Sequence, residues 1–387
     1  MRIALIAAAA IIAAVVLTLG PRLVGDMLEQ RSLAEFAVQP ADALDGKPGT
    51  IVRSERLEGR PAGADAWRIM YRTTDLNGAV VVTTAIVVTP QELAPEGGRT
   101  VLAWGHPTTG TAEDCAPSRS FDPYIGIEGM RIMLDRGYTI VATDYVGMGT
   151  EGPNSYLIGA TAAHSILDAV RAAQALPESQ AGDSVILWGH SQGGQAVLFA
   201  AEQAQQYAPE LDILAVAAAA PAADLSALME SHLDDVSGVT IGSYAFQAYS
   251  EIYADRGADL DLLLTLAAQQ ILPEMNQLCL LTHLSELHEI AGPVIGDFVS
   301  ANPSGVEPWA TLLQENSAGG SAFSAPLFVA QGMQDQLVLP EDTQKFIDGE
   351  RGLGIDVAYH RIDAADHGTI AYLALPALSE WLDSLNV

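Results

Sequence analysis

The sequence predicts an α/β fold in which a mostly parallel sheet carries helices on both faces. From residue 100 onward, short apolar runs typical of buried strands alternate with helical patterns. One of these runs leads directly into a serine between glycines, and another helical pattern follows. The alternation stops near residue 224 and resumes near residue 323, which indicates a helical insertion into the sheet.

A strand hairpin is predicted ahead of the alternating part. Residues 67–71 and 79–88 are rich in β-branched and aromatic side chains, and Asn77 and Gly78 between them are a hairpin turn signal. Residues 26–65 are mixed in pattern and punctuated by Pro and Gly, so we expect them to form an extended lead-in.

The alternating part has clear element boundaries. The strands predicted there cover residues 100–104, 139–143, 184–188, 213–220, 325–330 and 356–362. The helices predicted there cover residues 126–136, 160–175, 193–206, 341–349 and 371–385. Within the last helix, Pro376 is expected to mark the firm start, because Pro is favoured in the first helical turn.

The predicted domain organisation is a core interrupted by an insertion. Residues 26–223 and 323–387 form the core, and residues 224–322 form a helical cap or lid over it. The alternative for the insertion is a helical flank with no role in access. Residues 1–25 precede the core as a signal peptide or membrane anchor.

The N-terminal segment indicates export. Met1 and Arg2 precede an uncharged stretch over residues 3–20, which at about 1.5 Å per helical residue comes close to the thickness of a bilayer core. Pro21 is an awkward residue to follow a cleavage site, which favours an uncleaved anchor over a signal peptide. Either interpretation places the remaining chain outside the cytoplasm, as a periplasmic, extracellular or outward-facing anchored protein.

The charge and cysteine content exclude several classes of protein. The chain carries 48 acidic and 18 basic residues, for a formal net charge of −30. This charge repels phosphate backbones and anionic lipids, so we expect no nucleic-acid partner. Cys115 and Cys279 are too few for a Cys-only zinc site, but in an oxidising compartment they could form one disulfide across a long loop.

The segment from Gly189 to Gly193 has the pattern of a nucleophile elbow, which is a sharp turn from a strand into a helix. The central residue, Ser191, adopts a strained conformation in such a turn, and the residues two positions away must be small. The helix that follows presents unpaired N–H groups and a positive dipole end beside the serine. We therefore predict Ser191 as nucleophile and the Gln192 N–H as an oxyanion donor.

A serine nucleophile of this kind needs a base and an acid, which follow it in the order serine, acid, histidine. His367 lies between the last predicted strand and the last helix, where a sheet-based site expects its base. Asp335 follows the preceding strand and is the predicted acid. Asp363, Glu341 and Asp342 are alternatives, whereas Asp366 would not easily reach the ring of its own neighbour.

A second oxyanion donor is expected in the loop after the strand over residues 100–104. Pro107 has no N–H and cannot donate. Thr108 or Thr109 can donate by its backbone or its hydroxyl, and the sequence does not choose between them.

These motifs resemble those of the α/β-hydrolase superfamily, and within it the secretory lipase family of the yeast lipase A type with its bacterial relatives. The matching stretches are GHPTTGTAEDCAPS, GYTIVATDYVGMGTEGPNSYLIG, WGHSQGGQA, APLFVAQGMQDQLV and DHGT. The resemblance implies an α/β-hydrolase fold with Ser191, Asp335 and His367 as the triad. It further implies that Cys115 pairs with Cys279, which would anchor the cap to the oxyanion loop. Pro107 departs from the family, whose members often have Gly there.

The predicted function is hydrolysis of carboxylic esters through an acyl-enzyme, without a cofactor or metal. The substrate would be a small-molecule or lipid ester. A serine exopeptidase or amidase is the alternative, because amide hydrolysis uses the same triad; it would need cap carboxylates such as Glu286, Glu289 and Asp297 to hold an amine. A non-catalytic binding protein is the remaining alternative. Residues 147–152 match G-x-G-x-x-G, but Pro153 follows where a helix should begin, so no nucleotide site is predicted.

Overall fold

The computed structural model of the chain describes residues 31–387. The prediction of a signal peptide or anchor over residues 1–25 lies outside them. The described residues up to Pro40 belong to one compact unit, in which residues 31–37 are helical, and residues 41–387 form a second unit. Within residues 31–387, no helix is both long enough and apolar enough to span a membrane.

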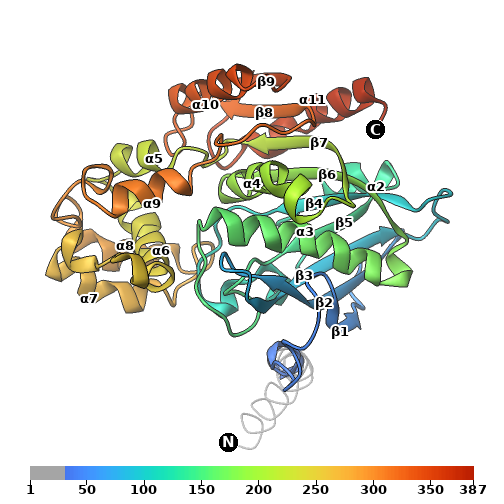
Figure 1. Ribbon diagram of the computed structural model, residues 1–387, viewed down its shortest axis with the longest axis horizontal. Coiled ribbons are helices and arrows are strands. Elements are labelled where there is room, and N and C mark those ends of the chain that lie inside the picture. The colour runs from blue at the N-terminus through green and yellow to red at the C-terminus, as the bar shows by residue number, and fades with distance from the viewer. Residues whose placement is uncertain (1–30) are drawn as a thin grey trace, which may run out of the picture. The chain divides into compact units, whose positions relative to one another are not determined.

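A single sheet organises residues 41–387 (Figure 1). Its strands follow the order β1-β2-β3-β5-β4-β6-β7-β8-β9. Neighbours from β1 to β5 in this order pair antiparallel. The remaining neighbours, β5-β4-β6-β7-β8-β9, pair parallel. The strands are β1 (Ile51–Arg56), β2 (Ala64–Thr74), β3 (Val80–Pro90), β4 (Arg99–Gly105), β5 (Thr139–Thr143), β6 (Ala181–His190), β7 (Asp212–Ala219), β8 (Leu327–Gly332) and β9 (Val357–Ile362).

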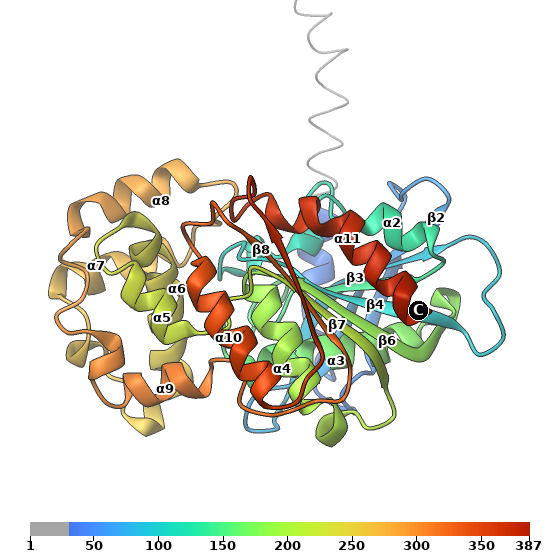
Figure 2. The ribbon, with the colours of Figure 1, turned by 90° about the horizontal axis from the view of Figure 1, so that it is seen from above.

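Helices cover both faces of the sheet (Figure 2). The core helices are α2 (Met130–Asp135), α3 (Gly159–Ala175), α4 (Gln192–Tyr207), α10 (Pro340–Gly352) and α11 (Ile370–Leu385). Side chains of α3, α4 and α10 pack in one buried cluster, and those of α2 and α11 pack in the other. The predicted α/β class, with a mostly parallel sheet between two helical layers, is confirmed.

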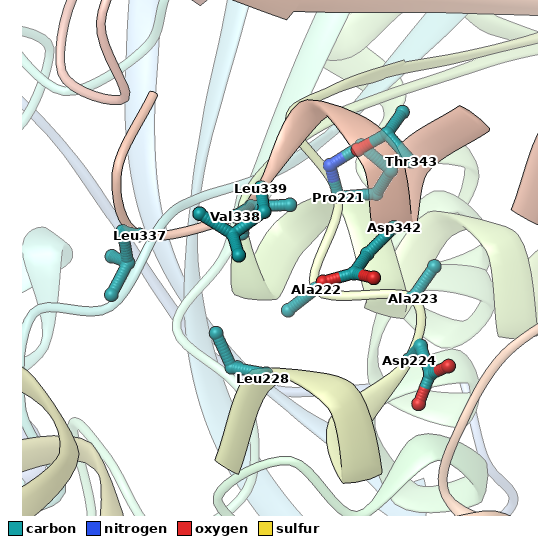
Figure 3. Close-up of a pocket in the computed structure, with 10 residues that line it drawn as sticks. All are labelled: Pro221, Ala222, Ala223, Asp224, Leu228, Leu337, Val338, Leu339, Asp342 and Thr343. Atoms are coloured by element: carbon teal, nitrogen blue, oxygen red, sulfur yellow. The ribbon is translucent and has the colours of Figure 1, made fainter. Parts of the chain in front are cut away.

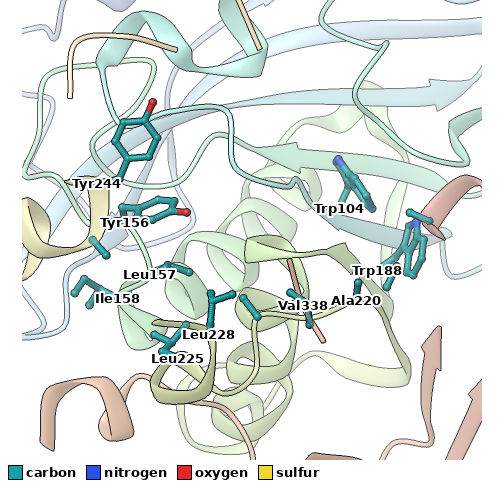
Figure 4. Packing of buried hydrophobic residues seen from close by; sticks show 14 of the residues in the cluster. Trp104, Tyr156, Leu157, Ile158, Trp188, Ala220, Leu225, Leu228, Tyr244 and Val338 are labelled. Carbon is teal, nitrogen blue, oxygen red and sulfur yellow. The ribbon is translucent and has the colours of Figure 1, made fainter. Parts of the chain in front are cut away.

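The central strand β6 shows how the sequence specifies both layers. Val185 and Leu187 point into the cluster of α3 and α4, whereas Ile186 and Trp188 point into the opposite cluster. This alternation is why the strand reads as a continuous apolar run. Figure 4 shows Trp188 beside Trp104 of β4, with ring centroids 5.7 Å apart. The strand that leads to Ser191 is therefore fixed on both faces.

The structure differs from the predicted elements at one strand and two helices. The region predicted as an extended lead-in contains β1, an edge strand. Its charged and partly exposed residues do not show the apolar alternation that predicts a strand. The helix predicted over 126–136 is shorter, because Gly129 adopts a positive φ of 88° and α2 begins after it. The expectation that Pro376 starts the last helix is wrong. Helix α11 begins at Ile370 and continues through Pro376, because its apolar face is buried along its length.

The residues between β7 and β8 are mainly helical. They contain α5 (Leu225–Ser231), α6 (Val236–Ile252), α7 (Leu266–Met275), α8 (Leu284–Ala291) and α9 (Trp309–Glu315). Figure 3 shows Leu228 of α5 near Leu337 and Val338, which lie in the loop between β8 and α10. Figure 4 shows Tyr244 of α6 beside Tyr156 of the core, and the two rings meet edge to face at 5.7 Å. The insertion therefore packs against core loops through apolar side chains.

Two carboxyl groups lie near Gly319: that of Glu202 on α4, which is half-buried, and that of Glu350 on α10, which is buried. Burial raises the pKa of each carboxyl group to about 7, and repulsion by the nearby Glu202 carboxylate further raises the pKa of Glu350. Glu202 accepts a hydrogen bond from the Gly319 N–H at 2.7 Å. Both oxygens of Glu350 lack a hydrogen-bond partner among the described residues. Such a group favours the protonated form.

We expect Glu350→Gln to remove part of the pH dependence of stability. A carboxyl whose pKa is raised by folding stabilises the native state below its unfolded pKa, and this contribution is lost as the pH rises through about 7. At pH 8 the variant should exceed the wild type by about 2 kcal/mol in unfolding free energy. At pH 5 the two should be nearly equal. Urea unfolding at both pH values measures this, and an equal difference at both would contradict it.

Candidate active site

Ser191 lies on the turn between β6 and α4, in a conformation that L-residues rarely adopt. Its φ is 56° and its ψ is −117°. The turn is held by the Ser191 N–H, which donates to the Ala219 carbonyl at 3.0 Å, and by the Ser191 carbonyl, which accepts from the Ala222 N–H at 3.0 Å. These bonds to the neighbouring strand end stabilise the strained residue, as a nucleophile elbow requires.

The glycines around Ser191 are needed for close backbone approach. A Cβ at Gly189 would lie 2.1 Å from the Gly193 carbonyl oxygen. A Cβ at Gly193 would lie 1.9 Å from the Gly105 carbonyl oxygen. The first turn of α4 therefore packs directly against the end of β4, which brings the loop after β4 to the side of Ser191.

A continuous hydrogen-bond chain joins Ser191, His367 and Asp335. His367 Nε2 lies 2.9 Å from Ser191 Oγ. His367 Nδ1 lies 2.8 Å from Asp335 Oδ2. With the proton on Nδ1 donated to the carboxylate, Nε2 is left to accept the serine hydroxyl proton. The three residues predicted from the sequence are thus brought together in the order that acyl transfer uses.

Asp335 is buried and heavily hydrogen-bonded, which fixes its orientation. Its Oδ1 accepts from the N–H groups of Leu337 and Val338, each at 2.9 Å. Its Oδ2 also accepts from Gln331 Nε2 at 3.3 Å. Gln331 is itself held by the hydroxyl of Thr343, which donates to Oε1 at 2.8 Å. No sequence pattern marks Gln331, because its contact with Asp335 depends on a turn that only the fold defines.

The alternative acids do not reach His367. Asp366 instead accepts hydrogen bonds from the N–H of Thr369 at 3.0 Å and from its hydroxyl at 2.6 Å, which starts the turn into α11. Asp363 and Glu341 are exposed, and Asp342 accepts from Lys345 Nζ at 2.8 Å. Of these carboxyl groups, it is Asp335 that hydrogen-bonds to the ring of His367.

The loops after β8 and β9 are joined by backbone hydrogen bonds, which explains why Asp335 meets His367. The Met333 N–H donates to the Ile362 carbonyl at 3.0 Å, and the Gln334 N–H donates to the Ala365 carbonyl at 2.9 Å. Gly332 makes this approach feasible, because a Cβ there would lie 2.5 Å from the Ala365 oxygen.

The loop after β4 faces the same space as Ser191. Gln192, Thr108 and Thr109 line one cavity with Ser191 and His367. The hydroxyl of Thr108 is engaged with the Tyr156 hydroxyl at 2.7 Å, and the Thr109 carbonyl accepts from the Leu280 N–H at 2.8 Å. Their backbone N–H groups stay the candidates for the second oxyanion donor, together with the Gln192 N–H at the start of α4.

A disulfide and a hydrogen bond connect this loop to the insertion. Cys115 and Cys279 are bonded, with Cα atoms 5.2 Å apart. The neighbouring Leu280 donates to Thr109, as described above. The pairing implied by the family resemblance is present, and it ties the segment after α7 to the loop that lines the Ser191 cavity.

The cavity beside Ser191 has a volume of about 640 Å³ and mainly apolar walls. Side chains from the core and from the insertion contribute to it. The apolar residues that line it include Ile125, Leu228, Ile241, Leu281, Val338 and Tyr372. Its acidic lining residues are Asp114, Asp122 and Glu128, so the insertion carboxylates Glu286, Glu289 and Asp297 do not line it.

Three other histidines of the core have local partners. His106 is buried, which lowers its pKa to about 4, and its Nδ1 faces the Pro107 carbonyl at 2.6 Å. His164 stacks on Tyr207 with ring centroids 3.9 Å apart. His190 points away from Ser191 and faces Glu128 and the His367 carbonyl. Across residues 31–387, no group of His, Cys, Asp and Glu side chains is arranged to hold a metal ion.

The fold and the serine turn define the class of the protein as an α/β-hydrolase. A sequence model of the secretory lipase family matches residues 124–385, and the chain belongs to that family. It is 24% identical over 380 residues to a probable inactive lipase of Mycobacterium tuberculosis, covering 90% of this chain and 80% of the relative. It is likewise 24% identical over 396 residues to lipase 6 of Candida albicans, covering 92% of this chain and 82% of the relative.

The solved structures support the same fold. The crystal structure of Candida antarctica lipase A in its closed state superposes with a TM-score of 0.75 at 20% identity. The superposition covers 90% of this chain and 84% of that one. The family resemblance seen in the sequence is therefore confirmed, and membership of a secretory lipase family supports ester hydrolysis and export.

Proposed function

We propose that the protein is a serine hydrolase that cleaves carboxylic esters, with Ser191 as nucleophile, His367 as base and Asp335 as the acid that orients it. The observation that carries the proposal is the unbroken hydrogen-bond chain from Ser191 Oγ to Asp335 Oδ2, which opens onto an apolar cavity. One relative is named a probable inactive lipase. The complete chain of three side chains favours activity here.

The proposed reaction proceeds through an acyl-enzyme. His367 takes the proton of the Ser191 hydroxyl as Oγ attacks the ester carbon. The Gln192 N–H and an N–H from Thr108 or Thr109 donate to the oxyanion. His367 then gives the proton to the leaving alcohol. Water, deprotonated by the same ring, releases the acid and restores Ser191.

The cavity favours an ester with an apolar acyl or alcohol group. Its walls are mainly apolar, and no carboxylate of the insertion lines it. An exopeptidase would require an anion placed to hold the substrate amine. The cap residues predicted for that role are elsewhere, and the carboxyl groups that line the cavity, Asp114, Asp122 and Glu128, come from the core. Amide hydrolysis is therefore the second candidate. A non-catalytic binding role would not require the hydrogen-bond chain of Ser191, His367 and Asp335.

We assign residues 224–322 as a cap, because this segment supplies cavity walls and is tied to the oxyanion loop by the disulfide. We further propose that residues 1–25 direct export. Family membership agrees with an exported protein, and an oxidising compartment agrees with the bonded cysteines.

We expect the full-length protein to hydrolyse p-nitrophenyl esters and to prefer acyl chains longer than acetate. Each methylene buried in the cavity can contribute about 0.8 kcal/mol, or about fourfold in kcat/KM. Assays from acetate to palmitate measure this, beside an aminoacyl p-nitroanilide panel. Turnover of anilides alone would favour the exopeptidase. A folded protein that turns over neither class and resists a serine-directed phosphonate would contradict the proposal.

A further inference from the structure

His190, the residue before the nucleophile, is buried between two acceptors. Its Nε2 lies 2.9 Å from the carbonyl oxygen of His367. Its Nδ1 lies 3.2 Å from Glu128 Oε1 and 3.1 Å from Glu128 Oε2. His190 is 3% exposed and Glu128 is 5% exposed. A second imidazole–carboxylate pair, His190 and Glu128, therefore contacts the backbone of the proposed base.

The acceptors fix where the protons are. A carbonyl oxygen can only accept, so His190 Nε2 carries a proton and donates it to His367. Nδ1 faces the carboxyl group of Glu128. One N–H of the pair is thereby committed to the backbone of His367.

Glu128 is anchored to the strand that carries the nucleophile. Its backbone carbonyl accepts from Trp188 Nε1 at 2.9 Å. Trp188 is fully buried and precedes His190 by two residues on β6. Both members of the pair are thus fixed to β6, the same strand that positions Ser191.

The segment around His367 needs such an attachment. Asp363, Asp366 and Gly368 are exposed, and few of its side chains are packed in the core. Asp335 holds only the ring of His367, at Nδ1. His190 holds its backbone at the carbonyl. Together with the backbone bond from the Gln334 N–H to the Ala365 carbonyl, these attachments fix both the position and the rotation of the ring.

We propose that Glu128 and His190 are a positioning pair that holds the His367 backbone at the distance at which Nε2 reaches Ser191 Oγ. The pair touches no reacting atom and acts through His367. This inference rests on the proposed function, but it makes a structural claim that can be measured without turnover.

The two imidazole rings are close neighbours. The rings of His190 and His367 are 5.1 Å apart, and His367 becomes positive as the proposed reaction proceeds. The charged and titratable groups around them are Asp335 and Asp366 near His367, Glu128 on His190, and the phenol of Tyr372, whose pKa is raised by burial and by Glu128.

The test compares Glu128→Gln, His190→Ala and His190→Gln in the full-length protein. A glutamine at 190 can place its amide nitrogen near the position of Nε2 and keep the donor to His367. We expect hydrogen exchange of residues 363–369 to accelerate in Glu128→Gln and His190→Ala, and to recover in His190→Gln. Glu128→Gln provides the test if His190→Ala does not fold.

The kinetic expectation follows from misplacing the base. In Glu128→Gln and His190→Ala, kcat should fall about 10- to 100-fold while KM changes little. His190→Gln should regain most of the kcat lost in His190→Ala.

His232 supplies a matched control. It is also a buried imidazole between a carboxylate and a carbonyl, with Nδ1 at 2.6 Å from Asp235 Oδ2 and Nε2 at 2.9 Å from the Leu337 oxygen. His232→Ala removes no hydrogen bond to residues 363–369, so their hydrogen exchange should accelerate much less than in His190→Ala, although Leu337 also donates its N–H to Asp335. Unchanged exchange of that segment in both Glu128→Gln and His190→Ala would overturn the inference, whether or not the wild type hydrolyses esters. Absent turnover with accelerated exchange would reject only the proposed function.

Discussion

Ser191→Ala is expected to abolish ester turnover, with kcat reduced by about 10⁴-fold or more. The change removes the atom that would form the acyl-enzyme. Ser191 Oγ hydrogen-bonds to His367 Nε2, so the loss to the rest of the structure is one hydrogen bond. Alanine at this position meets the same backbone strain as serine, because both carry a Cβ at φ 56°.

Stability should therefore change little, which separates a chemical effect from a folding effect. Thermal unfolding of the variant should agree with the wild type to within a few degrees. A serine-directed phosphonate should label the wild type once per chain and leave the variant unlabelled. Retention of turnover by a purified, folded Ser191→Ala protein would remove the mechanism, and turnover lost together with the fold would call for Ser191→Cys instead.

The positions of Ser191 and His367, the proposed nucleophile and base, were predictable because their signals are local. Gly189, Ser191 and Gly193 form a turn in which steric crowding restricts the residue types. A Cβ added to either glycine would lie 2.1 Å or less from a backbone oxygen. His367 was identified by its place after the last strand. The parallel sheet followed from the alternation of apolar strands and amphipathic helices, which packing on both faces imposes.

The residues missed by sequence reasoning are those whose partners are distant in the chain. Glu128 meets His190 across 62 positions, and no local pattern marks either residue. Gln331 supports Asp335 only because the turn after β8 brings them together. Strand β1 was missed because an edge strand has no strong periodicity. Each failure concerns a feature set by tertiary contacts.

Asp335→Asn is expected to lower kcat by about 10³- to 10⁴-fold, as with triad acids generally. The reason lies in the hydrogen bonds around the carboxyl group. Oδ1 must still accept from the N–H groups of Leu337 and Val338, so the amide oxygen of asparagine takes that side. The amide nitrogen then faces His367 Nδ1. In the wild type, Nδ1 donates its proton to the carboxylate, but an amide nitrogen is itself a donor and cannot accept that hydrogen bond.

This arrangement forces His367 into the opposite tautomer, with its proton on Nε2 and directed at Ser191 Oγ. The ring can then no longer act as a base, although shape and packing are preserved. Matched measurements of kcat and thermal unfolding on Asp335→Asn and Asp363→Asn separate this effect from a loss of negative charge near the site. Asp363 is exposed, and its variant should behave as the wild type. If Asp363→Asn loses activity while Asp335→Asn keeps it, the acid lies on the loop after β9, and His367 must turn its Nδ1 away from Asp335 during the reaction.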